Sequence, residues 1–285
     1  MTAKLLDGRE LSRTMSKEIA ADVARFQEQY GWVPGIAVVQ VGEDPASSWY
    51  VGQIEKSFGR AGMNFALHTL PKDANAHDLV DLLKSLNADA HTNGIIVQMP
   101  LPKHLPQSLV TDTLDPAKDV DGIHPVNAGR LMQQSGDYFV PATPAGGMEM
   151  LRRYGVELKG LHAVMVGRSN IVGRPMALLM LHQHATVTIC HSRTKDLGAV
   201  CREADLLVAA VGKPKVITGD MIKPGAIVVD FGVNVVEGKL IGDVDTEAAM
   251  EVASMITPVP GGTGPMTNIM LMLNTLEAAR RQMAS

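Results

Sequence analysis

Cysteine, aromatic residues and long uninterrupted hydrophobic segments are all scarce in this sequence. Cys190 and Cys201 are the only cysteines among 285 residues, too few for a disulfide framework, which indicates a reducing compartment. No apolar run approaches the roughly 20 residues of a membrane span, and residues 1–15 lack the apolar core of a signal peptide. We therefore expect a cytoplasmic protein without a membrane segment.

An excess of charge of either sign is also missing. The net charge is −4, and basic residues occur singly rather than in stripes, so the sequence has no electrostatic footprint for nucleic acid. We expect no bound metal. The 46% hydrophobic content is too high for a disordered chain, and the length allows two compact domains.

Apolar segments alternate with helical patterns along the whole chain, which predicts an α/β fold with parallel sheets. In the first half, buried strands are expected at 35–42 and 93–102. The second half repeats the pattern in a βαβαβ series typical of a doubly wound, Rossmann-type dinucleotide-binding domain. Its expected strands contain HAVMVG, TVTICHS, ADLLVAAVG and AIVVDFGVN.

A segment rich in Asp, Gly and Pro between residues 112 and 150 predicts a domain boundary near residue 140. The final 20 residues have apolar positions at helical spacing and are expected to return to the first domain. We therefore predict an N-terminal domain of 1–139 plus about 266–285, a dinucleotide-binding domain of 140–265, and a ligand cleft between them.

The loop GRSNIVGRP, from Gly167 to Pro175, lies between an expected strand and a helix, where backbone N–H groups can bind a pyrophosphate. Glycine in such a turn also has a purely steric explanation. In NAD-binding domains the next strand usually ends in a carboxylate, but here the sequence reads Cys-His-Ser-Arg. Ser192, Arg193 and Arg168 suit a 2′-phosphate and favour NADP, although both arginines could simply be solvated.

Three polar positions outside this half are candidates for a substrate site: Tyr50 after DPAS, Gln98 after a buried strand, and Asp121 in DVDG. Each also has an ordinary structural explanation, as a half-buried helix residue, a strand-end amide and a turn former. A fourth element, TPVPGGTGPMT at 257–267, has the composition of a rigid loop that brings backbone close to a flat ligand.

In this order and spacing, the motifs VGEDPASSWYV, GIIVQMPLP, DPAKDVDGIHP, GRSNIVGRP, CHSRT, VDFGVN and TPVPGGTGPMT resemble the methylenetetrahydrofolate dehydrogenase/cyclohydrolase family over essentially the entire chain. The resemblance implies a homodimer in one-carbon metabolism that acts on tetrahydrofolate derivatives. Such enzymes oxidise 5,10-methylenetetrahydrofolate to the 5,10-methenyl form with NADP, and then hydrolyse that cation to 10-formyltetrahydrofolate.

The resemblance also implies roles for individual residues. Tyr50 should stack on the folate, Asp121 should orient the pterin, and Gln98 should line the reacting end. The implied substrate-binding set is Tyr50, Val97, Gln98, Met99, Asp121, Pro260, Gly261 and Gly262. The implied cofactor-binding set is Gly167, Arg168, Ser169, Gly173, Ser192, Arg193 and Val233.

One position departs from the family. Family members carry a lysine four residues after the tyrosine, one helical turn along the same face, where it serves the cyclohydrolase step. Here that position is Ile54. Lys56 lies about 200° away around the helix, so Lys56, like Gln53, is a doubtful substitute. Because hydrolysis needs proton transfer, we expect the cyclohydrolase to be lost or weak and a separate cyclohydrolase to be present in the cell.

Alternatives remain at this stage. The enzyme could be fully bifunctional despite Ile54. A shikimate-type dehydrogenase would share the two-domain plan, but it needs a lysine and aspartate pair that does not accompany these motifs. A non-catalytic folate or dinucleotide sensor is the alternative from another class of protein, and the intact cofactor motifs weigh against it.

Overall fold

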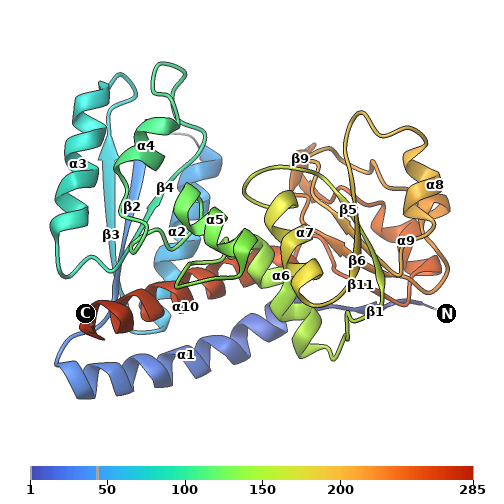
Figure 1. Cartoon of the computed structure of the whole chain (residues 1–285), viewed down its shortest axis with the longest axis horizontal. Helices are drawn as coiled ribbons and strands as arrows, with labels where there is room; N and C mark the ends of the chain where they lie inside the picture. The colour runs from blue at the N-terminus through green and yellow to red at the C-terminus, as the bar shows by residue number, and fades with distance from the viewer. Residues whose placement is uncertain (1, 43–44, 285) are drawn as a thin grey trace. The chain divides into compact units, whose positions relative to one another are not determined.

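The computed structural model describes residues 2–42 and 45–284 (Figure 1). The chain divides into two compact units. The N-terminal unit contains Thr14–Ala142 and Asn268–Ser285, and the C-terminal unit contains Thr143–Thr267 and Met1–Arg13. Each unit is built on a parallel β-sheet with helices, which confirms the two-domain α/β class.

The sheet of the N-terminal unit has three parallel strands, β2 (Gly35–Val41), β3 (Asn64–Leu70) and β4 (Gly94–Val97), with β2 in the middle. Six of the seven residues of β2 are buried, as expected for a central strand covered on both faces. All three strands end at the same edge of the sheet because they are parallel. Loops that follow these strands therefore meet at that edge.

Helices that lie wholly or mainly in the N-terminal unit are α1 (Gly8–Tyr30), α2 (Pro45–Arg60), α3 (Ala76–Ala88), α4 (Ser108–Thr113), α5 (Pro125–Gln133) and α10 (Thr263–Ala284). Helix α3 shows how local sequence sets a boundary. The Asn75 side chain accepts from the backbone of the first turn, and the Asp78 carboxylate accepts from the Asn75 N–H, which forms a capping box. Leucines at helical spacing then face the core.

The C-terminal unit has a six-stranded sheet in which every pairing is parallel. Its strands, in spatial order, are β1 (Lys4–Leu5), β11 (Met255–Ile256), β8 (Ile227–Asp230), β7 (Leu206–Ala209), β5 (His162–Val166) and β6 (Thr186–Cys190). The remaining elements are α6 (Ala142–Arg153), α7 (Gly173–His182), α8 (Leu197–Cys201), the 3₁₀ helix η1 (Gly219–Met221), α9 (Thr246–Val252) and the antiparallel hairpin β9 (Asn234–Val236) and β10 (Lys239–Ile241).

The strand order of the C-terminal sheet reverses beside β5. The chain passes from β5 to β6 on one side, and then crosses to β7 on the other side of β5. In doubly wound sheets, ligands bind outside the carboxyl ends of the strands at such a switch point. The loops after β5, β6 and β7 are therefore the ones whose geometry decides what this unit can bind.

The N-terminal residues join the C-terminal sheet, whereas the sequence-based division placed all of 1–139 in one domain. Strand β1 extends the sheet by pairing with β11 at Lys4 and Leu5, and Ala3 is buried in the core of the same unit. A two-residue strand with both side chains exposed leaves no alternation in the sequence, so the pattern could not reveal it.

No helix within 2–42 and 45–284 is both long enough and apolar enough to cross a lipid bilayer.

Candidate active site

Helix α2 places Tyr50 and Ile54 one turn apart on the same face. Ile54 is completely buried, in line with Val51 and Phe58 on the core side of the helix. Tyr50 is half-buried. Lys56 is exposed to solvent, as its angular offset from Ile54 requires.

The DVDG turn presents Asp121 near Tyr50. Its neighbour Asp119 is fully buried and accepts hydrogen bonds from the N–H groups of Ile123 at 3.1 Å and His124 at 2.8 Å. Asn127 Nδ2 also donates to Asp119, at 2.8 Å. These bonds fix the turn, so Asp121 is held by the backbone rather than by its own side-chain contacts.

Burial raises the pKa values of Asp121 and Tyr50. Desolvation raises the pKa of Asp121 to about 7, and the nearby Asp119 charge acts in the same direction. Desolvation also raises the pKa of Tyr50, and the Asp121 charge adds to that shift. Asp121 therefore changes charge in the neutral range, whereas Tyr50 stays a neutral phenol at physiological pH with or without the shift.

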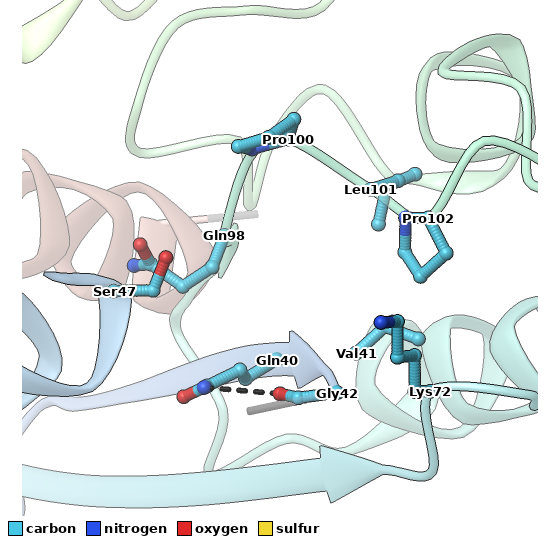
Figure 2. Close-up of a pocket in the computed structure, with 9 residues that line it drawn as sticks. All are labelled: Gln40, Val41, Gly42, Ser47, Lys72, Gln98, Pro100, Leu101 and Pro102. Carbon is cyan, nitrogen blue, oxygen red and sulfur yellow. Dashed lines mark hydrogen bonds between the residues drawn. The ribbon is translucent and has the colours of Figure 1, made fainter. Parts of the chain in front are cut away.

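A pocket of about 280 Å³ opens at the carboxyl edge of the N-terminal sheet (Figure 2). It is lined by Gln40, Val41, Gly42, Ser47, Lys72, Gln98, Pro100, Leu101 and Pro102. Figure 2 shows the Gln98 and Ser47 side chains on one side of the pocket and Lys72 with Pro102 on the other. Gln40 is fixed in the floor because its Nε2 donates to Gly42 O at 3.1 Å.

The two residues beside Gln98 face inward. Val97 is 5% exposed and belongs to the hydrophobic core of the N-terminal unit, and Met99 packs against that core. Their side chains therefore have a packing role, whereas Gln98 reaches the pocket. The backbone of Gln98 is held by a 2.8 Å hydrogen bond from its N–H to Val39 O.

The loop after β5 in the C-terminal unit is shaped by two glycines. Gly167 has φ +134°, and a Cβ added there would lie 2.2 Å from Ala210 O. A Cβ added at Gly173, the first residue of α7, would lie 2.5 Å from Gly167 O. Between them, the exposed Ser169 accepts from the N–H groups of Val172 at 3.1 Å and Gly173 at 3.2 Å.

The loop after β6 lies against this one, because Gly167 N–H donates to Cys190 O at 2.9 Å. It turns tightly, with His191 N–H donating to Thr194 Oγ1 at 2.8 Å. Ser192, Arg193 and, across the two loops, Arg168 are exposed. A hydroxyl and a guanidinium thus follow β6, where NAD-specific domains carry a carboxylate, and Arg168 follows the neighbouring strand β5.

Two further motif segments belong to the C-terminal unit. Val233 follows β8 and is 60% exposed. The Pro260-Gly261-Gly262 segment rests on the start of α1, where Arg9 N–H donates to Gly261 O at 3.1 Å. A Cβ on Gly8 would lie 1.8 Å from Gly262 O, so the backbones of the two segments approach closely there, and the Arg9 side chain lies against Gly261.

These loops fit a dinucleotide phosphate group. A close approach of backbone is possible only because Gly167 and Gly173 lack a Cβ. The loop lies at the carboxyl edge of the sheet before α7, which is a usual place for a pyrophosphate, while the N–H groups of Val172, Gly173 and Arg174 bond to Ser169 and shape the turn. The exposed Arg168 and Arg193 add positive charge beside that position.

Several supporting residues were not identified from the sequence. Gln40, Ser47 and Lys72 line the pocket although none belongs to the predicted site. Their shared signal is position, since each lies at or just after the end of a parallel strand or at the start of the following helix. Among the residues that the structure describes, no group of three or more His, Cys, Asp or Glu side chains could hold a metal ion.

The parallel sheets, the glycine loop between Gly167 and Gly173, and the turn after β6 with Ser192 and Arg193 define a two-unit α/β protein with a dinucleotide-binding unit. Residues 141–283 match the family model for the tetrahydrofolate dehydrogenase/cyclohydrolase NAD(P)-binding domain, and residues 6–121 match its catalytic domain. The chain belongs to the tetrahydrofolate dehydrogenase/cyclohydrolase family.

Known relatives match the chain over its full length. The bifunctional protein FolD of Roseiflexus sp. (strain RS-1) is 53% identical over 286 residues, covering 100% of this chain and 99% of that protein. The crystal structure of FolD from Campylobacter jejuni has a TM-score of 0.95 and 42% identity, covering 98% of this chain and 99% of that one. FolD from Trypanosoma brucei, in complex with NADP and an inhibitor, has a TM-score of 0.96 and 35% identity, with 100% of both chains covered.

Replacing Gly173 with alanine tests the glycine loop. The added methyl group would overlap the Gly167 carbonyl, so the loop and α7 must separate. Overpacking of this kind costs about 1–3 kcal/mol, and we expect NADP to bind roughly tenfold more weakly in titration calorimetry. Gly59→Ala is the control, since nothing lies within 4 Å of the added carbon. Unchanged binding by Gly173→Ala would show that this close approach does not shape the cofactor site.

Proposed function

We propose that this protein is an NADP-dependent methylenetetrahydrofolate dehydrogenase whose methenyltetrahydrofolate cyclohydrolase activity is lost or weak. The family membership supports the substrate class and the cofactor. The observation that carries the second part is Ile54, which is fully buried at the position where the family has a lysine. An enzyme of this kind would release the 5,10-methenyl cation as its product.

The residues of the N-terminal unit have roles that suit hydride transfer. Tyr50 offers the aromatic face of a neutral phenol, on which the folate can stack. Asp121 accepts hydrogen bonds from the pterin, and Gln98 lines the reacting end of the pocket. Holding the methylene bridge in place is the main requirement, because this oxidation needs no obligatory general base.

The residues of the C-terminal unit bind and select the cofactor. Gly167, Ser169 and Gly173 accommodate the pyrophosphate at the start of α7. Ser192, Arg193 and Arg168 bind the 2′-phosphate, which is why we propose NADP rather than NAD. Val233, with Pro260 and the glycines that follow it, completes the binding surfaces. When bound, NADP supplies the hydride acceptor.

Hydrolysis makes a demand that this chain does not meet. Attack of water on the methenyl cation requires a group that moves protons, and a buried lysine has the lowered pKa that suits this work. Isoleucine has no such group. The exposed Lys56 points away from the Tyr50 face, and Gln53 has an amide that does not titrate. Losing a positioned acid–base group typically costs 10² to 10⁴ in rate.

Full bifunctionality is the second candidate function, because the relatives at about 50% identity are named bifunctional FolD proteins. A third, from another class, is a sensor that binds folate or dinucleotide without turnover. The two enzyme alternatives share the dehydrogenase step and differ in the fate of the methenyl product. The sensor differs from both because it would reduce no NADP.

A single absorbance time course separates these functions. Purified protein is mixed with methylenetetrahydrofolate and NADP, and NADPH and the methenyl product are followed together where spontaneous hydrolysis is slow. We expect both to accumulate in equal amounts. NADPH formation without a build-up of the methenyl product would establish bifunctionality, and binding without NADPH formation would favour the sensor.

The variant Ile54→Lys tests the assignment of the missing group. We expect it to raise the rate of methenyl hydrolysis at least tenfold, because a lysine at this buried position acquires a lowered pKa. Ile54→Met keeps the apolar volume and is the matched control, which should leave hydrolysis at its original level. Equal hydrolysis by both variants would contradict the role given to this position.

Substrate affinity should depend on pH through Asp121. The ionised carboxylate can accept two N–H groups of the pterin, whereas the protonated form presents an O–H to one of them. Because its pKa is raised to about 7, protonation weakens binding as pH falls through neutrality. We expect the KM for methylenetetrahydrofolate to fall between about pH 6 and pH 8. Asp121→Asn should raise KM about tenfold and abolish this trend. A wild-type trend that persists in the variant would assign the titration to another group.

We also propose that the protein is a homodimer that pairs through β6. This strand is at the edge of the C-terminal sheet, and edge strands expose unpaired backbone groups. Ile189 on β6 and Leu181 on α7 are exposed by 46% and 53%. Sedimentation equilibrium should give twice the monomer mass, and Ile189→Glu should reduce it toward the monomer. A dimer that resists this change would place the interface elsewhere.

A further inference from the structure

Two buried carboxylates in the C-terminal unit, Asp243 and Asp230, lie outside the residues assigned to binding or catalysis. Asp243 is 0% exposed and accepts from four donors. Its Oδ2 accepts from the N–H groups of Val211 at 2.5 Å and Gly212 at 2.9 Å. Its Oδ1 accepts from Lys213 N–H at 2.9 Å and from Asn234 Nδ2 at 3.0 Å.

Asp230, the last residue of β8, is 1% exposed and accepts from three backbone donors. Oδ1 accepts from Gly232 N–H at 2.7 Å and from Asp243 N–H at 3.2 Å. Oδ2 accepts from Val244 N–H at 2.9 Å. Through the Asp243 N–H, one carboxylate fixes the backbone that carries the other.

The segments held in this way are two loops at the carboxyl edge of the sheet. Residues 211–213 follow β7, and residues 231–233 follow β8. Both neighbours of the exposed Val233 are bonded to a buried carboxylate, Gly232 to Asp230 and Asn234 to Asp243. The conformation at Val233 is therefore set from both sides.

The β7 loop is in direct contact with the glycine loop. Ala210 N–H donates to Val166 O at 2.8 Å, and Ala210 O lies where a Cβ on Gly167 would be. The three residues anchored by Asp243 come immediately after Ala210. A displacement of Val211 would therefore move the carbonyl against which Gly167 is packed.

Glycines lie against both carboxylates, at positions where any larger residue would clash with them. A Cβ on Gly232 would lie 2.4 Å from Asp243 Oδ1, and one on Gly242 would lie 2.0 Å from Asp230 Oδ2. Four donors converge on Asp243, and only an ionised carboxylate has acceptor sites for all of them. An asparagine would turn an N–H₂ group toward backbone N–H groups.

We propose that Asp243, supported by Asp230, is a positioning residue that holds the loops after β7 and β8 in the conformation that binds NADP. This inference rests on the proposed function, because the ligand it concerns is the dinucleotide. Neither carboxylate needs to touch the cofactor. Their effect passes through the backbone of 211–213 and through Val233, and therefore acts on affinity.

The test is the dissociation constant for NADP, measured by titration calorimetry on the purified full chain. We expect Asp243→Asn to raise it about tenfold, since a buried N–H group is left without an acceptor. The KM for methylenetetrahydrofolate should stay within about twofold of the original value. The preference for NADP over NAD should also persist, because Ser192 and Arg193 follow β6, away from the loops that Asp243 anchors.

Asp205→Asn is the matched control. Asp205 is a carboxylate of the same unit that accepts from His162 N–H at 2.9 Å and from Lys223 Nζ, but it precedes β7 and so lies at the amino edge of the sheet. We expect this variant to lose thermal stability without a change in NADP affinity. Equal weakening of NADP binding by both variants at equal loss of stability would overturn the proposal.

A milder variant covers the case in which Asp243→Asn does not fold. Asn234→Ala removes one donor from Asp243 and should weaken NADP binding about threefold. If Asp243→Asn folds and its affinity for NADP is unchanged, the positioning role is overturned while the proposed function stands. If Asp243→Asn does not fold, unchanged NADP affinity in Asn234→Ala has the same meaning. Absence of NADP binding by the original protein would instead overturn the proposed function.

Discussion

Backbone N–H groups just beyond the ends of parallel strands lack a ladder partner, and the protein satisfies them with buried aspartates. In the N-terminal unit, Asp119 accepts from the turn that presents Asp121. In the C-terminal unit, Asp230 and Asp243 accept from the loops after β8 and β7. A carboxylate is suited to this work because it accepts several bonds at once. The positions of Asp121 and Val233 depend on these acceptors, which are themselves buried.

The two reactions of the family make different demands on this framework. Oxidation of a methylene bridge depends mainly on holding two flat molecules in register, which rigid loops achieve. Hydrolysis additionally needs a titratable group at one place on α2. In this chain the α2 position is part of the hydrophobic core, because Ile54 is completely buried. The two demands fall on different parts of the structure, since the loops and the α2 position are separate segments of the chain.

Much of the architecture could be predicted from the sequence, because β5, β7 and β8 are continuous apolar segments separated by helical patterns. The glycine loop was equally visible, and the structure explains it by the contacts of Gly167 and Gly173. The roles given to individual site residues remain predictions.

Other features could not be read in this way. Strand β1 has only two residues, both exposed, and owes its place to pairing with β11. In DVDG, two aspartates of equal propensity differ only in burial, which tertiary packing decides. The same holds for Asp230 and Asp243, since a sequence shows that a residue is acidic but not which N–H groups will surround it.

The buried Ile54 has a consequence for inhibitor selectivity. Its side chain has no exposed surface, so a folate analogue bound beside Tyr50 does not contact it in this conformation. An analogue designed to pair with an ammonium one helical turn from Tyr50 would meet no cation here, and its polar group would gain no ion pair in return for its desolvation. Selectivity against such analogues therefore follows from a missing charge rather than from contact with the aliphatic side chain.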